Sequence, residues 1–430
     1  MAVLHPLLTQ NKSDYTMKLE KYSFGTGDRF GQQGKAQLDA VKKAKEKGVD
    51  IAVVWNKSHR EHAIVGTSQE DVRKEADMAI RSSNWPGSYH VDADHISLSN
   101  VDSFIDHSDF FTLDVADFIG KRGDENDLNA FTRKYSDYCG EFSIDGMSMV
   151  LEITTEKIRA IAEKYLVAVN EAAAIYKYIE SKKGRDNFIT EVSMDETAEP
   201  QTPEELLFIL AALADRGIPV QTIAPKFTGR FNKGVDYQGD VAQFSREFND
   251  DICVIRYAVS TFNLPDNLKL SIHSGSDKFS IYPGIREVIT QHNAGIHVKT
   301  AGTTWLEELI GLAESDQSSL KLVKEIYARA YFRFAELCVP YATVIDIDRD
   351  LLPSPDEFRK WSGPQVARSI RHDPECREYN LNIRQLLHVG YKVAAELGST
   401  YLQALQDNSE IVAEHVCANL FEKHIKPLFF

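Results

Sequence analysis

The sequence predicts an α/β protein built on a closed (β/α)8 barrel of the TIM type. Helical segments that end at a glycine run directly into short apolar strands, as in residues 34–55, 202–223 and 284–300. Such repeated steps from helix to strand indicate a mainly parallel sheet. Eight strand-like segments can be counted, the number that closes such a barrel. An open doubly wound sheet is the alternative, although no GxGxxG motif follows a strand.

The elements follow one another along the chain. Residues 202–217 make the clearest helix, because Thr202 can cap it, Pro203 suits its first position and Gly217 can end it. An apolar strand follows at once. The predicted strands lie near residues 20–25, 50–55, 88–94, 109–114, 187–192, 218–223, 268–273 and 295–299.

Two further regions lengthen the predicted barrel. The interval between the fourth and fifth strands exceeds one crossover, so we expect a helical insertion over about 120–185, with a long amphipathic helix near 153–184. A helical part follows from about 305 to 430. Repeats and flexible linkers are absent from the sequence, which predicts one elaborated catalytic domain over residues 1–430, with its barrel strands at about 20–300.

Composition limits the function classes. The chain has 430 residues, of which 43% are hydrophobic, and its sequence contains no apolar run of the roughly 20 residues that a membrane helix needs. A net charge of -15 would repel a phosphate backbone, so nucleic acid is not an expected partner. A small molecule is the expected partner, and a homo-oligomer is compatible with this composition.

Cysteine usage and the first residues indicate the compartment. The five cysteines are scattered and form no CxxC pair, which favours neither a disulfide framework nor a thiolate zinc site. The first twelve residues have neither a basic region nor a small-residue cleavage site, so we expect no secretory signal. The sequence therefore predicts a cytoplasmic protein whose metal ligands, if any, are histidines and carboxylates.

Ionisable residues gather where the predicted strands end, which is where barrel enzymes place their catalytic groups. In the segment SYHVDADHISLSN, strand alternation puts Asp92 and Asp94 on one face, and His95 follows at the turn. A solvent-exposed edge strand is the alternative explanation. Glu191 stands at the end of another strand, where a salt-bridge partner or a helix cap would be an ordinary role.

The segment LSIHSGSDKFSIY places His273 after an apolar strand. Ser274 and Ser276 can donate hydrogen bonds to an anion or a sugar hydroxyl, and Lys278 adds a positive charge. A hydrogen-bonded structural histidine is the alternative. Similar small-residue turns follow two other strands and supply further candidate substrate-binding residues, namely Asp28, Arg29, Lys226 and Arg230.

A last polar strand carries His297 and Lys299 on one face, followed by Thr300. A strand end that caps the next helix would explain the threonines but not the histidine. His95, His273 and His297 can converge on one divalent ion if the barrel closes, with an open position for a substrate carbonyl. Zinc, manganese, nickel or cobalt would suit such ligands.

Four segments resemble the tagaturonate epimerase family, namely GTGDRFG, HVDADH, HSGSDKFSIYP and HVKTAGTTW, and the resemblance covers roughly residues 15–400. It implies a metal-dependent epimerase that interconverts tagaturonate and fructuronate, or also tagatose and fructose. These uronates differ at a carbon β to the ketone, which simple enolisation does not invert. Retro-aldol cleavage and re-addition, or proton abstraction, would use Asp94 and Glu191 as the acid and base.

The sequence is more distantly similar to the class II aldolases. Asp94 and His95 match their adjacent acid and metal ligand, and His273 with the following Ser-Gly-Ser approximates their His-Gly-Gly-Ser-Gly turn. The remaining histidine ligand of those aldolases precedes this turn, whereas His297 follows it.

Three other functions stay open on the sequence alone. The first is a class II-type aldolase that acts on a sugar or a sugar acid. The second is a Schiff-base aldolase or isomerase, in which Lys226 or Lys299 attacks a ketone. A non-catalytic protein that binds a sugar acid would use the same lysines and hydroxyls. For the carboxylate of a sugar acid, Lys278 and Lys299 are the first candidates among the cations near the strand ends.

Overall fold

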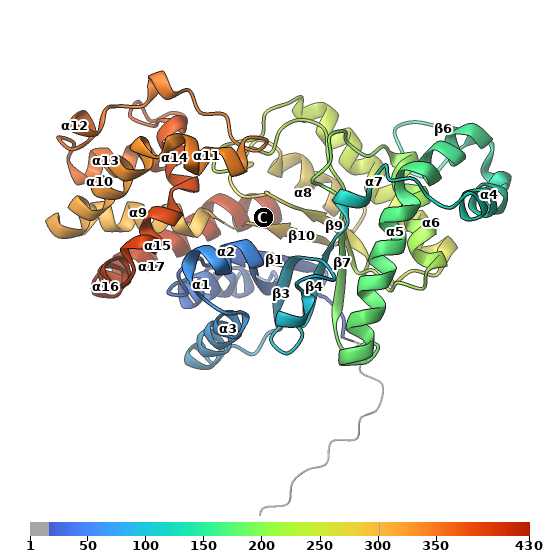
Figure 1. The fold of residues 1–430 in the computed structure, drawn as a ribbon, viewed down its shortest axis with the longest axis horizontal. Helices are drawn as coiled ribbons and strands as arrows, with labels where there is room; N and C mark the ends of the chain where they lie inside the picture. The colour runs from blue at the N-terminus through green and yellow to red at the C-terminus, as the bar shows by residue number, and fades with distance from the viewer. Residues whose placement is uncertain (1–16, 301) are drawn as a thin grey trace, which may run out of the picture.

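The computed structural model describes residues 17–300 and 302–430. Within these ranges, eight parallel strands close into a barrel in the order β1-β10-β9-β8-β7-β4-β3-β2 (Figure 1). The predicted fold class is thereby confirmed. The first twelve residues, in which we expected no secretory signal, lie outside the described ranges.

The barrel strands lie close to the predicted positions. The largest difference is at 218–223, where the strand begins only at Thr222. Pro219 has no N–H to donate, and the Val220 amide donates to the Ile218 carbonyl over 2.9 Å instead of to a neighbouring strand. The barrel strands are β1 Tyr22–Gly27, β2 Ala52–Ser58, β3 Tyr89–Ile96, β4 Phe110–Asp114, β7 Ile189–Ser193, β8 Thr222–Ala224, β9 Lys269–Ile272 and β10 Ile296–Lys299.

The predicted insertion contains the long helix α5 but also a small antiparallel pair that we did not predict, β5 Gly140–Phe142 with β6 Leu151–Ile153. Each of these strands has three residues, too few for a visible alternation pattern. The helices up to β10 are α1 Gly34–Glu46, α2 His59–Val65, α3 Gln69–Ser83, α4 Glu125–Lys134, α5 Thr155–Lys183, α6 Pro203–Asp215, α7 Val241–Phe262 and α8 Tyr282–Gln291.

Helix α6 forms the capping interactions that its sequence predicts at both ends. The Thr202 side chain accepts a hydrogen bond from the Glu205 amide, and the Glu205 side chain bonds back to the Thr202 amide. At the other end, Gly217 takes a φ of 70°, a left-handed conformation that glycine adopts without strain. The chain then enters β8 directly.

The chain after β10 is helical and forms a lobe beside the barrel (Figure 1). Its last helices return to the barrel, where Phe429 packs on Tyr22 with ring centroids 4.9 Å apart. The helices are α9 Thr303–Glu314, α10 Gln317–Phe332, α11 Phe334–Cys338, α12 Pro355–Phe358, α13 Gly363–Ile370, α14 Leu381–Val389, α15 Tyr391–Leu397, α16 Ser399–Asp407, α17 Ser409–Ala418, the π-helix η6 Asn419–Ile425 and α18 Lys426–Phe429. Short 3-10 turns are η1 Val101–Ser103, η2 Ala116–Phe118, η3 Ser136–Tyr138, η4 Val339–Tyr341 and η5 Arg349–Leu351.

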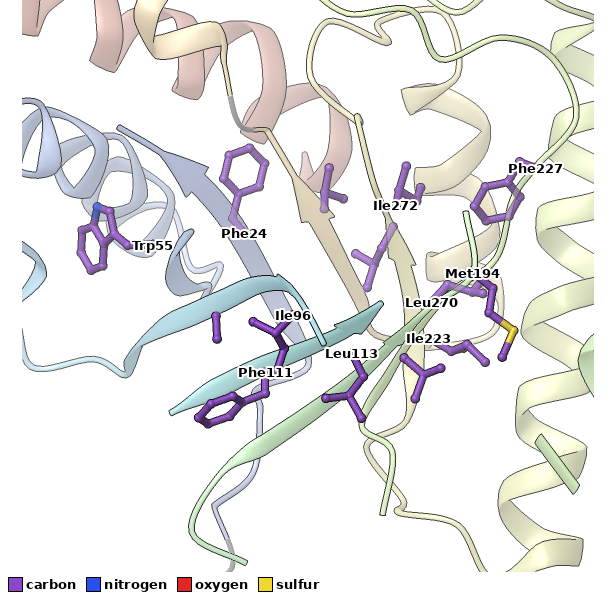
Figure 2. Packing of buried hydrophobic residues seen from close by; sticks show 14 of the residues in the cluster. Phe24, Trp55, Ile96, Phe111, Leu113, Met194, Ile223, Phe227, Leu270 and Ile272 are labelled. Atoms are coloured by element: carbon purple, nitrogen blue, oxygen red, sulfur yellow. The ribbon is translucent and has the colours of Figure 1, made fainter. Parts of the chain in front are cut away.

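Strand alternation divides the core into two parts. Outward-facing side chains such as Phe24, Phe111 and Leu270 pack under the surrounding helices (Figure 2). Residues at the starts of the strands face inward and form a separate apolar cluster, which closes the amino-terminal end of the barrel. Its members are Leu19, Ala52, Val54, Phe110 and Ile189. Ser23, His90 and Lys269 are buried polar residues near the strand starts, whereas the larger polar group lies towards the carboxyl ends of the strands.

No described helix combines the length and the apolar character needed to cross a lipid bilayer.

The interior apolar cluster predicts a large stability effect. Replacing Phe110, which is fully buried, with Ala leaves a cavity in a closed barrel that cannot collapse, so we expect a loss of about 3–5 kcal/mol in the free energy of unfolding. Urea denaturation measures this change. The control Phe332→Ala alters a side chain that is 75% exposed and should cost no more than about 0.5 kcal/mol. Similar losses in both variants would contradict the assignment of the cluster to the core.

Candidate active site

A buried lysine stands at the centre of the polar interior. Lys299, on β10, places its Nζ 2.7 Å from Asp92 Oδ2, 2.9 Å from Asp94 Oδ1 and 2.9 Å from Glu191 Oε1. It also donates to Thr112 Oγ1 over 2.6 Å. The acids come from β3 and β7, so one ammonium group joins three strands. Burial alone would lower the pKa of Lys299, but the carboxylates hold it well above its ordinary value.

The three carboxyl groups differ in their protonation. Burial raises the pKa of Asp92 to about 7. Lys299 acts to lower this pKa, and the two other acids act to raise it. Burial also acts on Asp94 and Glu191, but Lys299 and the nearby imidazoles hold the pKa of both well below the ordinary range. The surroundings therefore favour the ionised form of Asp94 and Glu191, and they favour the protonated form of Asp92 more than water does.

A second group lies at the carboxyl end of the barrel. His95, Asp195 and His273 each offer one ligand atom, and these atoms lie within 4.8 Å of one another. The rings of His95 and His273 have centroids 5.2 Å apart. The side chains of His95 and Asp195 are 25% and 23% exposed, so the group is open towards solvent. We call His95, Asp195 and His273 the rim cluster.

Carboxylates orient both imidazoles of the rim cluster. His95 Nδ1 lies 2.9 Å from Asp94 Oδ1, and His273 Nε2 lies 2.7 Å from Glu191 Oε1. The remaining nitrogen of His273, Nδ1, lies 3.2 Å from Asp195 Oδ1 but forms no hydrogen bond. Metal-binding histidines in proteins are typically held in this way by a carboxylate on the other nitrogen. The donor set therefore fits a divalent cation.

The electrostatics of the rim cluster agree with this fit. Burial would lower the pKa of both imidazoles, yet Asp94 raises the pKa of His95 to about 10, and Asp195 raises that of His273 to about 9. The Asp195 pKa is lowered by the same imidazoles, despite its burial. The surroundings thus favour positive charge at the two rings, which a bound cation would supply while displacing their protons.

His297 lies elsewhere than we expected from its sequence position. Its ring is fully buried, with Nδ1 2.9 Å from Ser23 Oγ and the ring packed on Phe110 at 5.3 Å. Burial lowers its pKa to about 3. The physical reason is depth, because His297 precedes Lys299 by two residues on β10 and therefore sits one layer further from the rim. The rim cluster contains Asp195 in the place that we predicted for His297.

Strand alternation is the sequence signal that points to Asp195. Glu191 and Ser193 face the barrel interior on β7, and the same alternation continued past the strand end reaches Asp195. The predicted strand 187–192 includes only Glu191 of these three. The structure brings five of the candidate residues together, namely Asp94, His95, Glu191, His273 and Lys299.

Lys278 is engaged by the backbone. Its Nζ donates to the carbonyl oxygens of Asn232, Val235 and Ser276 over 2.8, 2.7 and 2.9 Å. Because an ammonium group has three N–H donors, these bonds use all of them. Ser276 Oγ donates to Asp277 Oδ2 over 3.0 Å. Lys278 therefore stabilises the loop after β8, and Ser276 stabilises its own turn.

Three more candidate substrate-binding residues are engaged by other groups. Thr300 Oγ1 donates to the Gly25 carbonyl over 2.9 Å, and Lys226 Nζ donates to the carbonyls of Thr197 and Ala198. Arg230 lies 3.3 Å from Asp346 with half of its side chain exposed. Of the turn residues, Ser274 stays beside the rim cluster, and its Oγ lies 3.5 Å from Lys233 Nζ.

The two candidates after β1 also have protein partners. Asp28 accepts hydrogen bonds from the backbone amides of Phe30, Gly31 and Gln33, which fixes its own loop. Arg29 pairs with Glu61 over 3.1 Å, donates to the His388 carbonyl and lies 4.0 Å above the ring of Tyr391. Both residues are buried.

A model of the tagaturonate epimerase family (UxaE) matches residues 2–428. A tagaturonate/fructuronate epimerase from Thermotoga maritima is 29% identical over 422 residues, which cover 94% of this chain and 79% of that protein.

Solved structures with the same fold include a fructuronate-tagaturonate epimerase from Cohnella laeviribosi. Its complex with one glycerol aligns with a TM-score of 0.79 at 24% identity and covers 96% of this chain and 82% of that chain. Its native structure aligns with a TM-score of 0.76 and covers 96% and 83%. This similarity extends the barrel assignment to the whole arrangement of helices around it.

Removing the central ammonium should destabilise the protein in a pH-dependent way. Lys299→Met leaves three buried carboxyl groups without their cation, for which we expect a loss of about 3–5 kcal/mol near pH 8. Urea denaturation at pH 5 and pH 8 measures the change. Lys35→Met, which removes an exposed pair with Asp39, is the control and should cost at most about 0.5 kcal/mol.

The direction of the pH effect follows from the pKa shifts. In the wild type, the lowered pKa values of Asp94 and Glu191 contribute stability above their unfolded values of about 4, and it is lost as the pH falls through the folded values. Without Lys299 the folded pKa values rise instead, so the variant loses stability as the pH rises. A deficit that is larger at pH 5 than at pH 8 would contradict this account.

Proposed function

The chain belongs to the tagaturonate epimerase family, and from this premise we propose that it interconverts tagaturonate and fructuronate by inverting the carbon β to the ketone. The observation that carries the proposal is the rim cluster, placed where barrel enzymes bind substrates and joined to the carboxylates around Lys299. An epimerase needs a group that activates the ketone and a group that moves protons. In this proposal the rim cluster would hold the first group, and the carboxylates bonded to it would provide the second.

We propose His95, His273 and Asp195 as the ligands of a divalent cation. Two imidazole nitrogens and a carboxylate oxygen accept zinc, manganese, nickel or cobalt, and availability often decides among such ions. A cation held there would act as a Lewis acid on the substrate ketone. Support comes from the orientation of each imidazole by a carboxylate partner, Asp94 for His95 and Glu191 for His273.

Proton transfer is the second part of the proposal. On a retro-aldol route, a base takes the proton of the β-hydroxyl, and the bond between the α and β carbons breaks to give an aldehyde and the enolate of the ketone fragment, which takes the electron pair. The α carbon of the enolate then attacks the opposite face of the aldehyde, and the proton returns to the new alkoxide. Asp94 is the proposed base, because it contacts both Lys299 and His95 and keeps 12% of its side chain exposed.

Glu191 has surroundings that favour a positioning role. It is fully buried and accepts hydrogen bonds from His273, Thr112 and Thr222 while it contacts Lys299. We infer that it fixes the His273 ring and, through Lys299, the charge state of Asp94. Asp92, with a pKa of about 7, can exchange a proton at neutral pH beside the same ammonium group.

The geometry argues against a Schiff base. An amine must lose its proton to attack a ketone. Lys299 is held protonated by three carboxylates, and Lys226 donates to two backbone carbonyls. A protein that only binds a sugar acid would not need a proton-exchanging group beside ionised carboxylates. The assay for a product separates that function from an epimerase.

The direct test is product identification. We expect the protein, reconstituted in turn with each divalent ion, to convert tagaturonate to fructuronate, and chelation to abolish and metal addition to restore the activity. Chromatography identifies the products, and tagatose is assayed in parallel to learn whether a neutral ketose also reacts. Binding of tagaturonate without any product would support the sugar-acid binding protein, and activity that survives complete metal removal would contradict the metal-dependent route.

The ligand set has its own test in a pair of variants. Asp195→Asn should weaken binding of the divalent ion by at least about 100-fold, since even partners behind the ligands typically contribute 10–100-fold. His297→Asn, which can still bond to Ser23, should bind the ion as the wild type does. Isothermal titration calorimetry on the metal-free proteins measures both. The reverse ranking would return His297 to the ligand set.

A further inference from the structure

The loop after β8 carries a lysine that sequence reasoning did not select, Lys233. The backbone on both sides of it is held by buried cations. Lys278 Nζ donates to the carbonyls of Asn232 and Val235, and Arg384 Nε donates to the Gly234 carbonyl over 2.6 Å. The Lys233 amide itself donates to the Val344 carbonyl over 2.8 Å. The position of Lys233 is therefore fixed before any ligand arrives.

One of the buried cations that hold this loop, Lys278, belongs to the chain segment of the rim cluster, because it follows His273 by five residues. The other, Arg384 on α14, is fully buried and pairs with Asp277 of that segment over 2.8 Å. A rigid connection thus joins the Lys233 loop to the segment that carries a proposed metal ligand. Binding sites of high precision are built on such supporting contacts.

The Lys233 side chain differs from the other cations around the site. Its Nζ lies 3.5 Å from Ser274 Oγ, and within the described ranges no carboxylate oxygen lies within 4.0 Å of it. Lys299 and Arg29, by contrast, have carboxylate partners. Burial lowers the pKa of Lys233 although Glu196 and Glu61 oppose this from a longer range. A half-buried cation without a paired carboxylate gains more from an anion than a fully solvated one does.

The location of Lys233 selects the anion. Ser274 follows His273 directly and has a φ of 49°, so the chain turns sharply after the proposed ligand. A group bound between Lys233 and Ser274 is therefore next to the rim cluster. Only a few carbons separate the ketone from the carboxylate in such a sugar acid, so a cation close to the site that would activate the ketone can reach the carboxylate.

We propose that Lys233, together with the Ser274 hydroxyl, binds the carboxylate of the sugar-acid substrate. The inference rests on the proposed function and deepens it, because it names the group that distinguishes a uronate from a neutral ketose. The two lysines that the sequence suggested for the carboxylate already have other partners. Lys278 donates to backbone carbonyls, and Lys299 pairs with the acids of the barrel interior.

The test compares Lys233→Met, Lys233→Arg and a matched control. Lys183→Met is the control, because Lys183 is also partly buried with a pKa lowered by burial but donates to the Ile105 carbonyl near the start of β7, away from the rim. For Lys233→Met, the KM for tagaturonate should rise about 10–100-fold, the effect of losing a charge-assisted hydrogen bond. The kcat should change less, and Lys233→Arg should recover part of the loss.

Calorimetric titration of tagaturonate and tagatose into the metal-loaded proteins separates the possible causes. Lys233→Met should weaken binding of tagaturonate and leave that of tagatose within about threefold. Equal weakening for both sugars, an unchanged KM for tagaturonate, or the same loss in Lys183→Met would overturn the inference. If the wild type binds tagaturonate but does not convert it, the proposed function fails, while the titration still decides the role of Lys233.

Discussion

The pairing of one buried ammonium with three carboxyl groups governs the interior of this barrel. Lys299 on β10 reaches Asp92 and Asp94 on β3 and Glu191 on β7, strands that are not neighbours of β10 in the ring. Taking such charges out of water costs several kcal/mol each, and the cost is offset only when all partners are present. The apolar cluster that closes the amino-terminal end of the barrel excludes water from below, which strengthens these contacts.

The same ion pairs reach the solvent-facing end of the barrel. Asp94 and Glu191 each hold one imidazole of the rim cluster, so the orientation of His95 and His273 depends on carboxylates whose ionisation Lys299 maintains. His95 has a φ of 54°, a left-handed conformation that costs free energy in a non-glycine residue and that the surrounding contacts enforce. The helical lobe contributes through Arg384, which braces the segment after His273. Charge balance, ring orientation and loop position are thus parts of one connected network.

The sequence predicted the barrel well because its signals are local. Apolar strands that follow glycine-ended helices predicted the closed barrel. The polar alternation in β3 predicted that Asp94 and His95 belong to the site. The roles of Lys278 and Lys299 were beyond sequence reasoning, since a long side chain can bind substrate or protein, and their partners lie up to 207 residues away. His297 lies too deep inside the barrel to join the rim cluster. The depth of a residue depends on the register between paired strands, which one sequence does not reveal. Asp195 lies two alternation steps beyond Glu191, the last inward-facing residue of the predicted strand 187–192.

A divalent cation in the rim cluster would link the ion pairs of the barrel interior to the proposed reaction. Anomalous X-ray diffraction from crystals soaked in manganese or zinc can locate it. We expect one strong peak bonded to His273 Nδ1, an Asp195 carboxylate oxygen and the His95 nitrogen that does not face Asp94. A peak bonded to His297 Nε2 instead, or no peak among the three side chains of the rim cluster at saturating metal, would rule out this ligand set.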